Sequence, residues 1–185
     1  NPNAKITAFE PNKKLFQLLE EKYKKSGNII LNNLGVSNTN GELEFNENIL
    51  DETSTFESLN LDSKYLEKKV KVLGVTKESI IVDKYKVAVI SLSEFLKSNE
   101  SSSFDVLKID VEGHELPVLE GLFSNGNQFK IRLIQLESHN DDMYLSNSKH
   151  EDIDKLLNKN GFFEIAKIKH GFGDFAEIIY ENKDR

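Results

Sequence analysis

Residues 104–115, FDVLKIDVEGHE, decide the fold of this chain. The apolar run up to Ile109 has the nearly continuous hydrophobicity of a strand that is covered on both faces. The run ends abruptly in a polar cluster of Asp110, Glu112, His114 and Glu115. An open α/β sheet presents its chemistry in this way, at the carboxyl ends of its strands. We therefore expect an α/β domain with its functional groups at this edge.

Outward from this stretch, strand patterns and helical patterns alternate along the chain. Strands are expected at residues 5–11, 29–36, 85–90, 104–109 and 131–136. Helical three-to-four spacing places helices at residues 15–23, 91–97, 116–122 and 152–160. Two further strands, at residues 162–168 and 175–180, predict an antiparallel hairpin at the carboxyl terminus. The alternation predicts a doubly wound, mostly parallel sheet that closes with this hairpin.

Residues 46–80 are the least regular part of the sequence, rich in Asn, Ser, Thr and Glu with only short apolar runs. Loops of such length in a compact domain usually have a function or are mobile. We expect an irregular insertion over the sheet edge, with a short strand at residues 69–73. The length fits one domain with a substantial core, so residues 1–185 are expected to form a single domain.

The composition argues against several classes of function. The net charge of -7 and the pI of about 5.2 disfavour nonspecific binding of nucleic acid or of an anionic membrane, because both need a basic face. The absence of cysteine excludes disulfides, zinc thiolate sites and a thiol nucleophile. No apolar run has the length of a membrane span and no signal-peptide pattern is present, so a cytoplasmic location is expected.

Glu10 follows the first predicted strand and precedes Pro11, where a helix begins. Nucleotide-binding α/β folds place an acidic residue at such a strand end, where it accepts both hydroxyls of a ribose. A carboxylate at a helix amino terminus also interacts favourably with the helix dipole. The position of Glu10 alone supports both interpretations equally.

Asp110, Glu112 and His114 alternate beyond the central strand, and alternation in an extended segment puts side chains on one side. Glu137 follows the next predicted strand, so Asp110 and Glu137 are expected to meet at one edge of the sheet. Such a cluster can supply a general base or hold a divalent cation. It can equally be a helix start with capping carboxylates. No HxH or HExxH spacing is present, and we expect no metal.

Five stretches, in order, resemble the FkbM family of S-adenosylmethionine-dependent methyltransferases. They are KITAFEPNKKLFQLLEE, NIILNNLGVSNTNGELEF, VISLSEFLKSN, FDVLKIDVEGHELPVLEG and IRLIQLESH. The similarity runs from Ala4 to about Tyr180, and AFEPN and IDVEGHE are its most specific parts. It implies the class I methyltransferase fold, a Rossmann-like sheet closed by a carboxyl-terminal hairpin. It also implies S-adenosylmethionine as cofactor and O-methylation of a hydroxyl on a sugar or another small natural product.

The resemblance further implies roles for particular residues. The implied cofactor-binding residues are Glu10, Pro11, Gly35, Val36, Ser37 and Asp110. Glu10 would bind the ribose, the residues around Ser37 would lie near the adenine, and Asp110 would lie beside the methyl group. The implied catalytic residues, on the acceptor side, are Asp110, Glu112, His114 and Glu137. Asp110 and His114 are the candidate bases for the acceptor hydroxyl, and the two glutamates would orient the acceptor.

The family's first strand and its glycine-rich loop would precede Asn1, so the chain is expected to be truncated at its amino end. That strand would lie between the strands that carry Glu10 and Asp110, and its absence would leave two edges that must pair with something. Such edges favour a homodimer. The first alternative is a nicotinamide- or nucleotide-dependent Rossmann-like enzyme, which Glu10 fits equally. The second is a noncatalytic fragment without cofactor binding.

Overall fold

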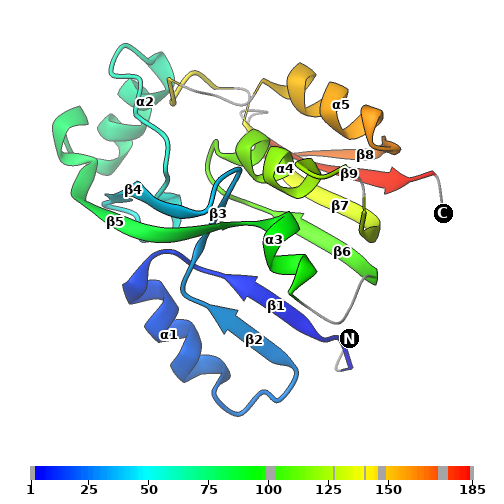
Figure 1. Ribbon diagram of the computed structural model, residues 1–185. Helices are drawn as coiled ribbons and strands as arrows, with labels where there is room; N and C mark the ends of the chain where they lie inside the picture. Colours follow the sequence, from blue (N-terminus) through cyan, green and yellow to red (C-terminus); the bar gives the residue numbers. More distant parts are fainter. Residues whose placement is uncertain are drawn as a thin grey trace.

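The computed structural model describes residues 3–98, 103–126, 128–139, 141–145, 149–170 and 175–183, which form three sheets and five α-helices (Figure 1). The strands are β1 (Ile6–Phe9), β2 (Ile29–Asn32), β3 (Gly35–Ser37), β4 (Gly41–Asn48), β5 (Ile81–Ser91), β6 (Ser103–Ile109), β7 (Lys130–His139), β8 (Phe162–His170) and β9 (Phe175–Asn182). The helices are α1 (Lys13–Tyr23), α2 (Lys64–Leu73), α3 (Leu92–Lys97), α4 (Glu115–Phe123) and α5 (His150–Lys159), with short 3-10 turns η1 (Asp51–Thr53) and η2 (Lys77–Ser79). The predicted α/β class is confirmed. No helix in the described ranges combines the length and the apolar character that crossing a membrane requires.

The strands pair in mixed sheets, so the expected doubly wound, mostly parallel sheet is not confirmed. β1 and β2 form a parallel pair. β5 lies between β3, which is parallel to it, and β4, which is antiparallel. The third sheet has the order β6-β7-β9-β8, and within it only β6 and β7 are parallel. The expected carboxyl-terminal hairpin is confirmed as β8 and β9, and its turn at residues 171–174 lies outside the described residues.

The main core lies between the third sheet and helices α4 and α5, which cover one face of that sheet in Figure 1. Its fully buried side chains include Leu119 of α4, Ile134 of β7, Leu157 of α5 and Ile178 of β9. Burying one such side chain contributes about 1.5–3 kcal/mol relative to leaving it exposed. The core therefore fixes α4, and with it the residues that connect α4 to β6.

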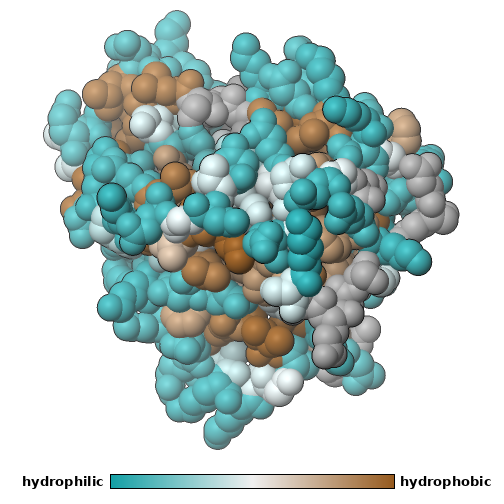
Figure 2. Space-filling view, viewed as in Figure 1, coloured by the Kyte–Doolittle hydropathy of each residue, from teal (hydrophilic) through white to brown (hydrophobic). Residues whose placement is uncertain are grey.

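β1 and β6 each have one unpaired edge among the described residues, since β1 pairs with β2 alone and β6 with β7 alone. The sequence predicts that both faces of β6 are covered, but Val106 is 52% exposed, and Ile6 of β1 is 45% exposed. β1 reaches the main core through Phe9, whose ring packs edge-on against Phe95 of α3 at a centroid distance of 4.8 Å. Figure 2 shows hydrophobic surface in the part of the molecule where Figure 1 places β1 and β2.

Residues 46–80 contain regular structure, which corrects the expectation of an irregular insertion. The strand expected at residues 69–73 is part of helix α2. The hydroxyl of Ser63 caps this helix by accepting a hydrogen bond from the Leu66 amide at 2.9 Å. Leu66 and Val70 are buried one helical turn apart. A helix forms because this spacing places both side chains on one face, against a second, smaller core.

The single strand expected at residues 29–36 is split into β2 and β3, which belong to different sheets. The side-chain amides of Asn32 and Asn33 donate to the carbonyl oxygens of Ala8 at 3.1 Å and Glu10 at 2.8 Å. These amides satisfy main-chain carbonyls near the end of β1. The backbone can therefore leave β1 and pair with β5 instead.

Candidate active site

Three carboxylates meet at the ends of β6 and β7 and form what we call the acidic rim: Asp110, Glu112 and Glu137. One oxygen of each lies within 4.8 Å of an oxygen of the other two. Ile109 is the register partner of Leu136, so the residues that follow them lie side by side. The structure thus brings Asp110 and Glu137 together as the sequence predicts, although Glu137 lies inside β7 and not beyond its end. Asp110 is exposed, and the two glutamates are half-buried.

Lys108 balances part of the negative charge of the acidic rim. Its Nζ lies 2.6 Å from Asp110 Oδ2. Burial lowers the pKa of Lys108, but the hydrogen bond to Asp110 and the surrounding carboxylate charges outweigh it and raise the pKa. Both side chains are substantially exposed, so the pair contributes only about 0–1 kcal/mol to stability. Three carboxylate oxygens at this spacing could also hold a divalent cation such as Mg²⁺ or Mn²⁺.

A tight turn at Glu112 and Gly113 connects β6 to helix α4. Both residues have positive φ angles, 50° for Glu112 and 94° for Gly113. Such an angle is uncommon for a residue other than glycine. A Cβ atom on Gly113 would approach the Tyr144 ring to 2.8 Å, so this position requires glycine. The Tyr144 hydroxyl donates to Glu112 Oε2 at 3.2 Å, and burial together with the Glu112 charge raises the pKa of Tyr144 and keeps the hydroxyl protonated.

A buried line of hydrogen bonds joins Ser37, His114 and Glu57. Ser37 Oγ lies 2.9 Å from His114 Nε2, and Glu57 Oε1 lies 2.6 Å from His114 Nδ1. The three residues are 1%, 7% and 7% exposed, in that order. Both ring nitrogens of His114, which the sequence suggests as a base, are therefore engaged by other groups of the protein.

Glu57 is a candidate functional residue that the sequence does not reveal. It lies 57 positions from His114 in the chain, so no local pattern links the two. The side-chain amide of Asn46, in β4, holds Glu57 in place by donating to its carbonyl oxygen at 2.9 Å. The only available signal is its position in the polar region that precedes α2.

Gly35, Val36 and Ser37 form β3, and other parts of the protein pack closely on them. A Cβ atom on Gly35 would lie 2.4 Å from the Phe56 ring, so glycine makes room for that ring. Val36 is half-buried and packs against the main core. A Cβ atom on Gly121 of α4 would lie 2.1 Å from the carbonyl oxygen of Ser37. Helix α4 therefore approaches β3 as closely as glycine allows. The expectation that Gly35, Val36 and Ser37 lie near an adenine stays a prediction.

Glu10 and Pro11 lie just beyond β1 and belong to neither of these clusters. Glu10 Oε1 accepts a hydrogen bond from the Asn12 amide at 2.8 Å. Asn12 is buried and caps helix α1 through its side-chain oxygen. Burial raises the pKa of Glu10, and the hydrogen bond from the Asn12 amide opposes this rise only in part. Nitrogen Nδ2 of Asn12 is buried and has no hydrogen-bond partner in the described part of the chain.

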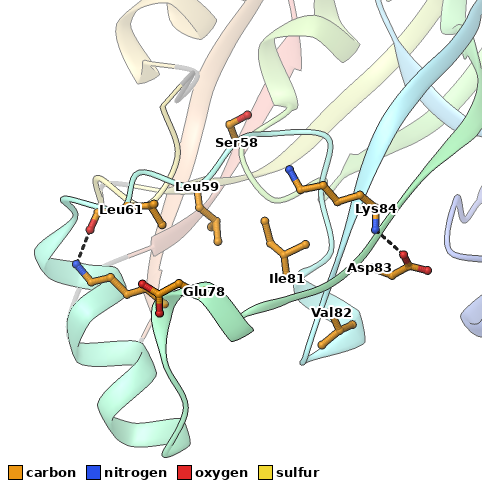
Figure 3. A pocket seen from close by; sticks show the side chains of 9 residues that line it. Ser58, Leu59, Leu61, Glu78, Ile81, Val82, Asp83 and Lys84 are labelled. Atoms are coloured by element: carbon orange, nitrogen blue, oxygen red, sulfur yellow. Dashed lines mark hydrogen bonds between the residues drawn. The ribbon is translucent and has the colours of Figure 1, made fainter.

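A cavity of about 420 Å³ lies between residues 58–61 and the start of β5 (Figure 3). Its lining combines apolar and charged side chains, among them Leu59, Leu61, Ile81, Lys77, Glu78 and Lys84. In Figure 3, the side chains of Leu59 and Ile81 point toward each other. Lys77, which also lines the cavity, donates from Nζ to the carbonyl oxygen of Leu61. None of the residues predicted for the site lines this cavity. Its wall nevertheless begins at Ser58, which directly follows Glu57.

The fold and the site define an α/β domain with acidic side chains at the carboxyl ends of β1, β6 and β7. The chain belongs to the FkbM methyltransferase family, because the methyltransferase FkbM domain matches residues 1–163. It is similar to the hexuronic acid methyltransferase AglP of Haloferax volcanii, with 26% identity over 157 residues, which are 84% of this chain and 54% of that protein. The chain thus spans about half the length of this relative. No solved structure matches it. The predicted family is confirmed.

Proposed function

We propose that this chain is the methyl-transfer domain of an S-adenosylmethionine-dependent enzyme that modifies a hydroxyl of a sugar or another small natural product. The observation that carries the proposal is the acidic rim at the ends of β6 and β7 in a chain of the FkbM family. The relative is named for a hexuronic acid, which supports a sugar as acceptor. A carboxylate is the side chain suited to orient a hydroxyl donor and to accept its proton.

Glu10 fits the ribose of the proposed cofactor. Its Oε1 accepts from the Asn12 amide, while its Oε2 has no hydrogen-bond partner in the described ranges and can accept from a hydroxyl. The unpartnered Nδ2 of Asn12 adds a polar group at the same place. When bound, S-adenosylmethionine supplies an electrophilic methyl group on its sulfonium. Besides Glu10, the residues proposed to hold the cofactor are Pro11, Gly35, Val36, Ser37 and Asp110.

The acidic rim is proposed to orient the acceptor and to take its proton. Asp110 is the exposed member, so it can reach a bound hydroxyl, and Glu112 and Glu137 lie beside it. Removal of a proton by a positioned base contributes about 10²–10⁴-fold to a rate. We assign the proton to the rim and not to His114, because both nitrogens of that ring already have partners.

The charge of the acidic rim favours a neutral hydroxyl as the group that is methylated. Three carboxylates within 4.8 Å of one another repel an anion, and Lys108 balances only part of their charge. A carboxylate acceptor would need a cation between itself and the rim. Neutral sugars are therefore expected to be better acceptors than the carboxylate of a uronic acid.

We also propose that the chain is part of a longer cytoplasmic protein in which a further strand lies between β1 and β6. Both strands have an unpaired edge among the described residues, and half-exposed apolar side chains lie on each. Unpaired edges are templates for another strand. Where no such strand is supplied by the same protein, these edges favour a homodimer.

Transfer of a labelled methyl group by the full-length protein to neutral sugars and to uronic acids tests the proposal. D110N, E112Q and E137Q should each lower kcat, the strongest by about 10²-fold or more. E112Q and E137Q should leave the affinity for S-adenosylhomocysteine nearly unchanged, whereas D110N should also weaken it, because Asp110 is proposed to contact the cofactor as well. E67Q, at an exposed residue of α2 whose carboxylate pairs with Lys71, is the matched control. A folded full-length protein that binds no S-adenosylhomocysteine, or that prefers a nicotinamide cofactor, would refute the proposal.

A further inference from the structure

Residues 55–57 touch the turn that carries Glu112 and the start of helix α4. Thr55 Oγ1 donates to the carbonyl oxygen of Glu112 at 2.8 Å and accepts from the Glu57 amide at 3.1 Å. The Phe56 ring lies 5.2 Å from the His114 ring, centroid to centroid. Glu57 holds His114 Nδ1 at 2.6 Å. Three consecutive side chains from one segment therefore contact two groups of the β6–α4 connection, the Glu112 carbonyl and the His114 ring.

This segment is itself held firmly. Thr55 and Asn46 exchange two main-chain hydrogen bonds, 2.8 and 3.0 Å long, which attach the segment to β4. The Asn46 side chain adds a third bond, to the Glu57 carbonyl oxygen. Thr55, Glu57 and Asn46 are all buried. The segment can therefore act as a fixed support for the turn, whose Glu112 has a left-handed backbone conformation that needs support from its surroundings.

The hydrogen bonds of His114 connect both nitrogens of its ring to other groups of the protein. An ionised Glu57 can only accept, so the hydrogen must lie on His114 Nδ1. In the neutral ring, Nε2 then accepts from the hydroxyl of Ser37, which ties β3 to the same support. The Ser-His-Glu order resembles a hydrolytic triad, but the Ser37 hydroxyl is buried against His114 and is not placed to attack an acceptor. The hydrogen bonds of this arrangement therefore hold His114 and β3 in place and do not prepare a nucleophile.

We infer that Thr55 and Glu57 are positioning residues for methyl transfer: they hold the Glu112 turn and His114 so that the acidic rim faces the acceptor in a productive geometry. The inference rests on the proposed function of the rim. Neither residue touches the acceptor in this scheme. Their loss should therefore impair catalysis and use of the acceptor, while binding of the cofactor at Glu10 continues.

Isosteric substitution separates this role from a general effect on folding. Thr55→Val keeps the shape of the side chain and removes its hydroxyl, whereas Thr55→Ser keeps the hydroxyl. In the full-length protein we expect T55V to lower kcat, or kcat/KM for the acceptor, about tenfold, equivalent to about 1.4 kcal/mol. T55S should recover most of this loss. Calorimetric titration with S-adenosylhomocysteine should give the wild-type affinity and stoichiometry for both variants, and E67Q should match the wild type throughout.

Glu57→Gln supplies a readout that does not depend on activity. Nitrogen NMR of the imidazoles, with the His114 ring identified by its contact to Phe56, reports which ring nitrogen carries the hydrogen. We expect Nδ1 to be protonated in the wild type and the fraction of rings with hydrogen on Nδ1 to fall in E57Q, because a glutamine amide, unlike a carboxylate, can also donate to Nδ1. The same variant should lower kcat about tenfold with cofactor affinity unchanged.

Wild-type turnover in both T55V and E57Q would overturn the inference. The inference would also be overturned if the activity of the variants fell only in proportion to the fraction of protein that still binds S-adenosylhomocysteine, because such a loss reports unfolded protein. If the wild-type protein transfers no methyl group, the proposed function is refuted instead. Independently of activity, a wild-type His114 ring without hydrogen on Nδ1 would refute the role of Glu57.

Discussion

Replacement of Gly121 by alanine tests how closely helix α4 must pack on β3. A Cβ atom at this position would lie 2.1 Å from the Ser37 carbonyl oxygen and 3.0 Å from its carbonyl carbon. Ordinary contact begins at 3.4 Å, so the helix or the strand must move by about 1.3 Å. Alanine in a helix is favoured over glycine by about 1 kcal/mol. Overpacking costs about 1–3 kcal/mol, and the upper value applies here because the obstacle is main chain. The net expectation is a loss of about 2 kcal/mol.

Urea unfolding followed by far-UV circular dichroism measures this loss as a lower midpoint at an unchanged slope. Gly27→Ala is the matched control, because a Cβ atom there meets nothing within 4 Å and its φ is not positive. G27A should be neutral or slightly stabilising, by up to about 1 kcal/mol. If the urea midpoint of G121A equals or exceeds that of the wild type, α4 does not pack on β3 as closely as described.

Three further substitutions test other parts of the structure. Ser63→Ala removes the cap of α2 and the hydroxyl bonded to Asp142, and should lower the free energy of unfolding by about 1 kcal/mol in the same urea assay; an unchanged midpoint would contradict the cap. Leu119→Ala leaves a cavity in the main core and should cost about 2–5 kcal/mol, so a loss well under 1 kcal/mol would contradict its burial. Glu10→Gln tests a carboxyl group whose pKa is raised by burial. Since the folded pKa lies above the unfolded one, the contribution of Glu10 to stability is present below the unfolded pKa and is lost as pH rises through the folded pKa. E10Q should therefore be more stable than the wild type at neutral pH but not in acid, and should bind S-adenosylhomocysteine more weakly. A stability difference that does not depend on pH would refute this.

The sequence predicts those elements whose signals are local. The serine cap at Ser91 and the helical spacing behind it suffice for α3. Helix α2 is different, because KVKVL at residues 69–73 alternates as a strand does, and its β-branched residues favour a strand. Tertiary contacts decide the outcome, since Leu66 and Val70 are buried while Val72 is 86% exposed. The split between β2 and β3 depends on amides that bind carbonyls more than twenty residues away.

For the candidate site, the sequence predicts what lies on neighbouring parallel strands. Asp110 and Glu137 converge because the register of β6 and β7 brings them together. The meeting of Ser37 with His114 and Glu57 depends on where β3 and residues 55–57 pack, which no short-range pattern encodes. Long-range polar contacts of this kind are set by the packing of whole elements, so the support of the site is harder to predict than the site itself.

The attachment of β1, α1 and β2 to the rest of the molecule has a consequence for ligand binding. None of the residues of α1 is buried, and this unit reaches the main core through Phe9. Units with few buried contacts open at free energies below that of global unfolding, so their amides should exchange with solvent first. Glu10 lies on this unit. A ligand held by Glu10 would bind only the closed form, and by mass action it would slow hydrogen exchange throughout β1, α1 and β2.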